Sequence, residues 1–279
     1  MTLSQEQITN VEHVLRNALR RKFQKYNPEP AYMPFHTRLL GKDRLALYSF
    51  IHSLNTNFGT SIFEPVALAL SSSNYVTAES QQTVGIQIST DAQRVIQNII
   101  DRLATAKTSD IYPNKPDETD AIRSVCTQGE MRPVRLTKAD IKLVAHDGTI
   151  FFIDLKTAKP NAGEFKGFKR TLLEWVAATL ATNPTANVQT LIAIPYNPYE
   201  PADYNRWTMR GMLDIDNELK VANEFWDFLG GNGSYQDLLC IFERIGIELR
   251  DEIDGYFAKH NYNARVNVFE NKSETADAS

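Results

Sequence analysis

The spacing of hydrophobic positions changes along the chain, and each spacing predicts a different element. Residues 4–26 carry apolar side chains at helical intervals against a polar face, which predicts a surface helix. A shorter helical run follows near residues 43–55. The stretch GTSIFEPVALALSSS then predicts a loop that enters a helix, with Glu64 in its first turn.

The middle of the chain alternates between strand and helix patterns. Residues 83–89 alternate like a strand, and a cap at Thr90 or Asp91 predicts a helix to about residue 106, followed by a polar connection over 108–120. Two apolar runs around an Asp-Gly turn predict a hairpin, an apolar stripe predicts the next helix, and residues 188–194 read as a buried strand. The predicted order is helix, strand, strand, strand, helix, strand, in the α/β (α+β) class.

The hairpin carries charge where buried strands would not be expected to carry it. A two-residue Asp147-Gly148 loop would mix acids and apolar residues on both faces. A three-residue loop over 146–148, with glycine in the left-handed conformation, sorts the faces cleanly. Asp140 then lies opposite Asp154, with Lys156 next on that side. The other face is wholly apolar and consists of Ile141, Leu143, Ala145, Phe151, Ile153 and Leu155.

Two acids and one lysine on one face predict a particular chemistry. Carboxylates on neighbouring strands repel each other unless a cation lies between them. Oxygen ligands suit Mg²⁺, and Mn²⁺ can substitute for it. Such an ion polarises a phosphodiester, while Lys156 orients the attacking water or balances charge on the phosphorus. The alternative is that Asp-x-Lys is ordinary solvated decoration at a strand end, because the bare spacing is common.

Composition narrows the classes of protein without choosing among them. With 279 residues and 42% hydrophobic content, the chain can form one large domain. A formal charge of -4 argues against a general polyanion binder, so contacts with nucleic acid would need local basic patches. Two distant cysteines and five scattered histidines give neither a disulfide framework nor a zinc motif. No apolar run is long enough for a membrane span, which predicts a soluble, cytoplasmic protein.

Asp140 followed by Asp154-Leu155-Lys156 after a hairpin, and then by a helix and a strand, resembles the PD-(D/E)XK nuclease superfamily. The resemblance implies an αβββαβ core, with Asp140, Asp154 and the Leu155 backbone carbonyl as metal ligands. Ala139 stands where the name-giving proline would be, at a position that carries no chemistry. Such enzymes often place a further acid on the helix before the sheet, which makes Glu64 a candidate. The alternative is that Glu64 merely interacts favourably with the helix dipole.

The resemblance extends to a family of type II restriction endonucleases that cut interrupted palindromes of the GGNCC kind. It rests on GTSIFEPVA, IDLKTAKPN, FKRTLLEW, IPYNPYEP and EFWDFLGG, spread over roughly residues 59–245. It implies Mg²⁺-dependent hydrolysis of double-stranded DNA that leaves 5′-phosphates, a homodimer to match the palindrome, and a cognate DNA methyltransferase that protects the host. Two alternatives stay open: a repair or junction-resolving nuclease of the same superfamily, and a DNA-binding module without turnover.

Two groups of side chains are candidates for DNA contacts. Lys166, Lys169 and Arg170 share a face of the helix after the hairpin, where they could grip phosphates or simply be solvated. A loop after residue 194 could read bases but could equally serve packing or phosphate contact; its candidates are Asn197, Asn205, Arg206 and Arg210.

One endonuclease domain is expected over residues 1–270, with a catalytic core at about 59–195. DNA-recognition and helical additions would occupy 1–58 and 196–270, and a disordered tail 271–279.

Overall fold

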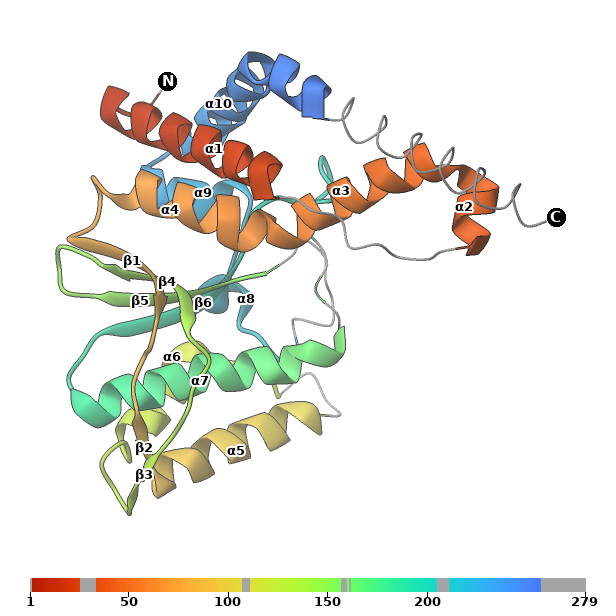
Figure 1. Cartoon of the computed structure of the whole chain (residues 1–279). Helices are drawn as coiled ribbons and strands as arrows, with labels where there is room; N and C mark the ends of the chain where they lie inside the picture. The colour runs from red at the N-terminus through yellow and green to blue at the C-terminus, as the bar shows by residue number, and fades with distance from the viewer. Residues whose placement is uncertain are drawn as a thin grey trace.

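The computed structural model describes residues 2–25, 34–106, 111–156, 160, 162–204 and 211–256. Its centre is a mixed five-stranded sheet in the order β1-β4-β5-β6-β7 (Figure 1). β1 pairs antiparallel with β4, β4 antiparallel with β5, and the last three strands run parallel. The strands are β1 Thr77–Gln82, β4 Ala139–Val144, β5 Ile150–Leu155, β6 Val188–Ile194 and β7 Leu219–Val221.

Helices cover both faces of this sheet (Figure 1). On one side lie α1 Gln5–Lys25, α4 Glu64–Ser71, α9 Asn223–Gly230 and α10 Ser234–Glu248. On the other lie α6 Lys115–Arg123 and α7 Phe165–Thr182, with α5 Thr90–Ala104 packed against α7. The short α8 Ile215–Glu218 leads into β7, while α2 Pro34–Leu40 and α3 Lys42–Phe58 extend from the body. A cluster of buried apolar side chains runs from Leu3 to Leu249 and holds these layers together.

The predicted αβββαβ core is present as α4, β1, β4, β5, α7 and β6. Its first strand was predicted wrongly, because residues 77–82 form it and not residues 83–89. β1 reads TAESQQ, an edge strand whose side chains are exposed or half-buried, so it has no apolar periodicity to reveal it. Within 83–89 only β2 Gln87–Ser89 is a strand, and it pairs with β3 Met131–Pro133 in a separate two-stranded sheet.

Three further local predictions were wrong. GTSIF is not a loop: Gly59–Phe63 is a π-helical turn, η1, that links α3 to α4. The helix α6 begins inside the supposed connection 108–120, capped by the Asn114 side chain, which accepts the backbone N–H of Asp117. The cap of α5 is Ser89 rather than Thr90 or Asp91, since the Ser89 hydroxyl accepts the N–H of Ala92. The short η2 Ala162–Glu164 precedes α7.

The predicted hairpin register is confirmed. Ile141 pairs with Ile153, and Leu143 pairs with Phe151. The turn is closed by backbone hydrogen bonds of 2.9 Å from Ala145 to Thr149 and 3.0 Å from Gly148 to Ala145. Gly148 has φ +84°, the left-handed conformation that favours glycine at this position. Among the described residues, no helix is both long and apolar enough to cross a membrane.

Candidate active site

Asp140 and Asp154 lie next to each other at the end of the sheet where β4 begins and β5 ends. The register that pairs Ile141 with Ile153 continues to place Asp140 across from Asp154. One Asp140 oxygen, Oδ2, accepts the backbone N–H of Leu155 at 2.8 Å, which fixes this carboxylate against β5. Asp154 is only 5% exposed. Two acids therefore share one partly dehydrated face, as the hairpin register predicts.

The Asp154 carboxyl group has a perturbed acidity. Its burial raises the pKa to about 6, and the neighbouring Asp140 charge adds to this effect, whereas Lys156 opposes it. Such a carboxyl group loses its proton more readily when a cation approaches, since the cation favours the charged form. The acidity of Asp154 is therefore suited to a site that alternates between proton and metal.

Lys156 follows β5 directly and returns to the same face. Its ammonium nitrogen Nζ lies 2.8 Å from Asp154 Oδ1, and its side chain is 27% exposed. The same nitrogen lies 4.8 Å from the ring centre of Phe168, on the first turn of α7. The ion pair with Asp154 and the contact with the aromatic ring of Phe168 together hold the lysine beside the hairpin acids.

Glu64, the first residue of α4, reaches the same region through Gln81 of β1. Its side chain is 4% exposed, and Oε2 accepts a hydrogen bond of 3.0 Å from the Gln81 side-chain amide. Burial raises the pKa of Glu64, the Gln81 bond opposes this, and Asp140 adds to it. The helix-dipole alternative loses its basis, because the preceding residue Phe63 is itself helical and α4 continues η1.

Gln81 is a site residue that the sequence did not reveal. Its amide nitrogen donates to Glu64 Oε2 and also to Asp140 Oδ1, the latter at 3.1 Å. It lies in a strand without apolar alternation, so no pattern marked it. The only sequence signal was the run of two glutamines beside a serine, which is too common to carry information.

The basic residues of α7 separate into different environments. Lys166 is 52% exposed and lies 3.9 Å from Asp101, so it is free to reach a phosphate. Arg170 is half-buried and donates a hydrogen bond of 2.5 Å to Gln97. Lys169 is completely buried, with its ammonium group 2.6 Å from Glu218 and 2.5 Å from Glu118. The predicted DNA contact of Lys169 is therefore wrong, because its charge is neutralised inside the protein.

Lys169 belongs to a buried ionic network that the sequence did not predict. Lys115 Nζ lies 3.1 Å from Glu218 and 2.5 Å from the Thr190 hydroxyl. Burial alone would raise the pKa of Glu218, but Lys115 and Lys169 together hold it below its usual range. We call the two lysines, Glu118 and Glu218 the buried ionic network. It joins α6, α7 and α8 behind the sheet, and its members come from three distant sequence segments.

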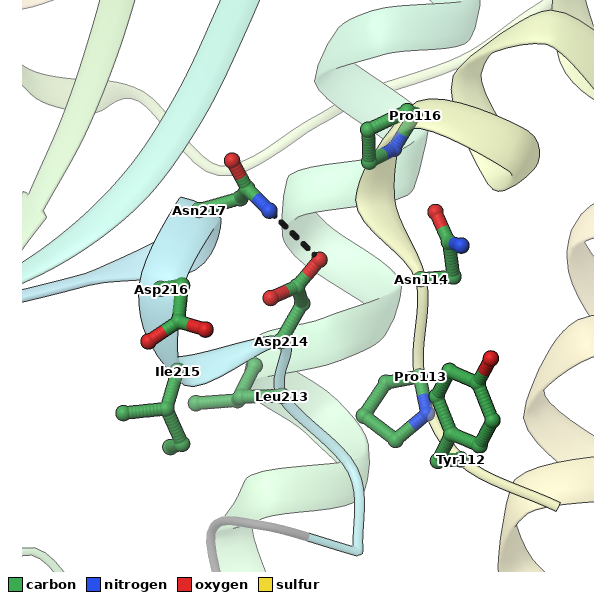
Figure 2. A pocket seen from close by; sticks show the side chains of 9 residues that line it. All are labelled: Tyr112, Pro113, Asn114, Pro116, Leu213, Asp214, Ile215, Asp216 and Asn217. Atoms are coloured by element: carbon green, nitrogen blue, oxygen red, sulfur yellow. Dashed lines mark hydrogen bonds between the residues drawn. The ribbon is translucent and has the colours of Figure 1, made fainter. Parts of the chain in front are cut away.

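A pocket of about 370 Å³ is lined by two segments that adjoin network residues in the chain, 112–116 and 213–217; Figure 2 shows its lining side chains. Its lining includes Asp214, which accepts hydrogen bonds of 2.9 Å from the Asn217 side chain and from the backbone of Lys115. The lining contains none of the predicted catalytic residues, so this pocket is not the candidate active site.

The predicted base-reading loop is described only in part. Asn197 is engaged within it: its amide donates to the Ala202 carbonyl at 2.8 Å and its oxygen accepts from the Tyr199 backbone at 3.0 Å. Asn205, Arg206 and Arg210 lie outside the described residues.

Asp140 and Asp154 match a Mg²⁺ site, in which water supplies most of the ligands, better than a metal site that protein side chains enclose completely. Among the residues that the structure describes, no three acidic, histidine or cysteine side chains converge closely enough to enclose a metal. Mg²⁺ usually keeps several waters and takes only one or two carboxylates, which Asp140 and Asp154 can supply. The Leu155 carbonyl lies between Asp154 and Lys156 in the chain and remains a predicted ligand.

Comparisons with known proteins find type II restriction enzymes. The family described as "Type II restriction endonuclease, HinfI" matches residues 3–246. The chain is 25% identical over 222 residues to the type II restriction enzyme HgiCII of Herpetosiphon aurantiacus, covering 79% of this chain and 80% of that one. It is 28% identical over 260 residues to the type II restriction enzyme MjaII of Methanocaldococcus jannaschii, covering 83% of this chain and 68% of the relative.

Proposed function

Because the chain belongs to the HinfI family of type II restriction endonucleases and therefore cleaves DNA at specific sites, we propose that it does so by Mg²⁺-dependent hydrolysis at Asp140, Asp154 and Lys156. The proposal rests on one observation, the surplus of negatively charged side chains at the site. Two neighbouring carboxylates face a single lysine there, so the cluster needs a further cation to balance it.

Each residue has a chemical role in this proposal. Asp140 and Asp154, with the Leu155 carbonyl, would hold the metal. When bound, Mg²⁺ supplies Lewis acidity toward a phosphate oxygen and makes a coordinated water more acidic. Lys156 is positioned by Asp154 and Phe168 to orient the attacking water or to neutralise charge on the phosphorus. Glu64 would fix the surrounding water shell from α4.

The target in this proposal is double-stranded DNA at a short interrupted palindrome of the GGNCC kind, cut to leave 5′-phosphates. The competing target within the family is GANTC. A palindrome presents the same half-site twice, so we expect a homodimer with one active site for each strand. A cognate methyltransferase would protect host DNA. Light scattering of the protein with and without an oligonucleotide containing the site would measure the oligomeric state.

Recognition is proposed to lie outside the catalytic core. Lys166 and Arg170 would contact phosphates near the scissile bond, because α7 starts directly after the site. The loop that follows β6 would contact bases, with Asn197, Asn205, Arg206 and Arg210 as candidates. We propose one domain over 1–270, with a core at about 59–195 and additions over 1–58 and 196–270; the predicted tail over 271–279 lies outside the described residues.

Digestion of a long DNA of known sequence tests the proposal directly. The protein is incubated with the DNA in Mg²⁺, in Mn²⁺ and in EDTA, beside an Asp154→Ala variant. We expect discrete bands that require the metal and are missing with the variant; sequencing their ends identifies GGNCC or GANTC. Metal-dependent bands of wild-type intensity from Asp154→Ala would contradict the assignment of the site.

A further inference from the structure

We propose that Gln81 is a positioning residue that organises the acids of the active site before the metal binds. The inference rests on the proposed function, because it assumes that Asp140 and Asp154 hold the metal. One amide group links two carboxylates: Nε2 of Gln81 lies 3.0 Å from Glu64 Oε2 and 3.1 Å from Asp140 Oδ1. It is thus the physical connection between α4 and the hairpin acids.

The strand register places Gln81 in line with both predicted metal ligands. β1 pairs with β4 through Ser80 with Ile141 and Gln82 with Ala139, so Gln81 stands across from Asp140. Asp140 in turn stands across from Asp154 on β5. The three side chains form a row across neighbouring strands, close enough for cross-strand contact.

The backbone of Gln81 is unusual for its residue type. Its φ is +54°, in the left-handed region that is unfavourable for residues other than glycine. Pairing with β4 is interrupted at this residue and resumes at Gln82. A glycine would adopt this conformation without strain, so a side chain retained here points to a use for the side chain itself.

A neutral amide suits this position better than a charged group. A lysine would neutralise the acids and compete with the metal, and another acid would add to the repulsion between the carboxylates of Glu64 and Asp140. The amide has two N–H donors, one for each carboxylate, and no net charge. It can therefore hold Glu64 and Asp140 in a fixed arrangement while leaving the negative charge available for a cation.

Metal binding measured without turnover tests this role. Mn²⁺ is titrated into the full-length protein without DNA, and free Mn²⁺ is counted by electron paramagnetic resonance. Gln81→Met keeps the side-chain size but removes both donors, and we expect about tenfold weaker binding, in line with the loss of other groups that orient metal ligands. Cleavage at saturating metal should fall less than cleavage at low metal.

The neighbouring glutamine is the matched control. Gln82 lies on the same strand, but its amide donates to the Ser80 carbonyl at 3.0 Å and contacts none of the acids. Gln82→Met should keep wild-type Mn²⁺ affinity. A second variant, Gln81→Gly, relieves the left-handed backbone, so it should keep or raise the melting temperature and still bind Mn²⁺ about tenfold more weakly. A purely structural role predicts the opposite for thermal stability.

The same titration separates failure of this inference from failure of the proposed site. Asp154→Ala should lose Mn²⁺ binding at the site. If it binds like wild type, the proposed metal site is wrong, and the role of Gln81 falls with it. If Asp154→Ala loses binding while Gln81→Met keeps wild-type affinity, only the role of Gln81 is overturned. Adding Gln81→Met to the Glu64→Gln variant should weaken Mn²⁺ binding less than Gln81→Met does in the wild-type protein. The hydrogen bond between Gln81 and Glu64 is already altered in that variant.

Discussion

The part of the chain that the structure describes contains two clusters of acids and lysines that differ in the balance of their charges and in their access to solvent. The buried ionic network has two lysines and two glutamates, all at most 2% exposed, and its charges cancel. The candidate active site has two hairpin acids, with Glu64 nearby, against Lys156, which is 27% exposed. The charges of the network are paired with one another inside the protein, whereas the site has surplus negative charge and a lysine that solvent reaches. Both clusters contain charged side chains. The candidate active site differs from the network because its charges do not cancel and because solvent reaches it.

Replacing the lysine at each cluster should produce the largest contrast. Lys156→Ala should reduce cleavage by more than about 1,000-fold, because the group that acts on the water or phosphate is gone. Its melting temperature should change little, since the side chain is partly solvated. Cleavage is measured on DNA with one site, and binding by gel shift in Ca²⁺. Near-wild-type cleavage would remove Lys156 from the proposed mechanism.

Lys169→Ala should act on stability instead. It leaves Glu118 and Glu218 buried near each other without their shared cation, at an expected cost of about 3 to 5 kcal/mol in the free energy of unfolding. Unfolding in urea measures this loss in the free energy of unfolding. The control is Lys142→Ala, which breaks a more exposed pair with Glu79 and should cost no more than about 1 kcal/mol. Equal effects of the two variants would show that the network is not structural.

Asp154 and Glu218, one carboxyl group from each cluster, should respond to pH with opposite sign, whereas burial raises the pKa of Glu118 in the network, in the same direction as that of Asp154. Because the pKa of Asp154 is raised to about 6, the folded protein binds this proton more tightly than the unfolded chain does. The Asp154 contribution therefore lowers stability by about 2 kcal/mol as pH rises from about 4 to 6. The pKa of Glu218 is lowered, so its contribution is present above its ordinary pKa and is lost as the solution becomes more acidic.

Unfolding in urea without Mg²⁺, measured at several pH values, checks these signs. Asp154→Asn should flatten the fall in stability between about pH 4 and 6 and make the metal-free protein more stable at neutral pH. Glu218→Gln should remove part of the rise in stability as pH increases through the same acidic range. Parallel pH profiles for both variants would contradict the opposite environments of the two carboxyl groups.

The smallest effect is expected at the boundary of the site. Phe168→Leu keeps an apolar side chain but removes the ring 4.8 Å from Lys156, which should lower cleavage by about fivefold. Phe165→Leu on the same helix is the comparison. The Phe165 ring is buried and packs edge-on against Phe168, with 6.0 Å between ring centres, so its loss should affect stability first. A steady-state cleavage assay beside thermal melting separates the two.

Much of the candidate site follows from local pattern. Side-chain alternation along the hairpin and the glycine at position 148 leave one register that keeps charge off the apolar face, and the structure has that register. The helix α7 and the strand β6 also follow from their apolar periodicity. β1 and α6 do not follow, because one is a polar edge strand and the other starts at an Asn-Lys-Pro cap within a polar segment.

The sequence by itself therefore determined the hairpin, the helix α7 and the strand β6 of the core, the meeting of Asp140 with Asp154 and Lys156, and the resemblance to restriction endonucleases. All of these depend on neighbours along the chain or across one hairpin. Only the tertiary structure decided that Lys169 is buried, that Glu64 and Gln81 reach the hairpin acids, and that Lys115 shares Glu218 with Lys169. Such contacts join segments far apart in sequence, and a helical face records its spacing but not which neighbour will cover it.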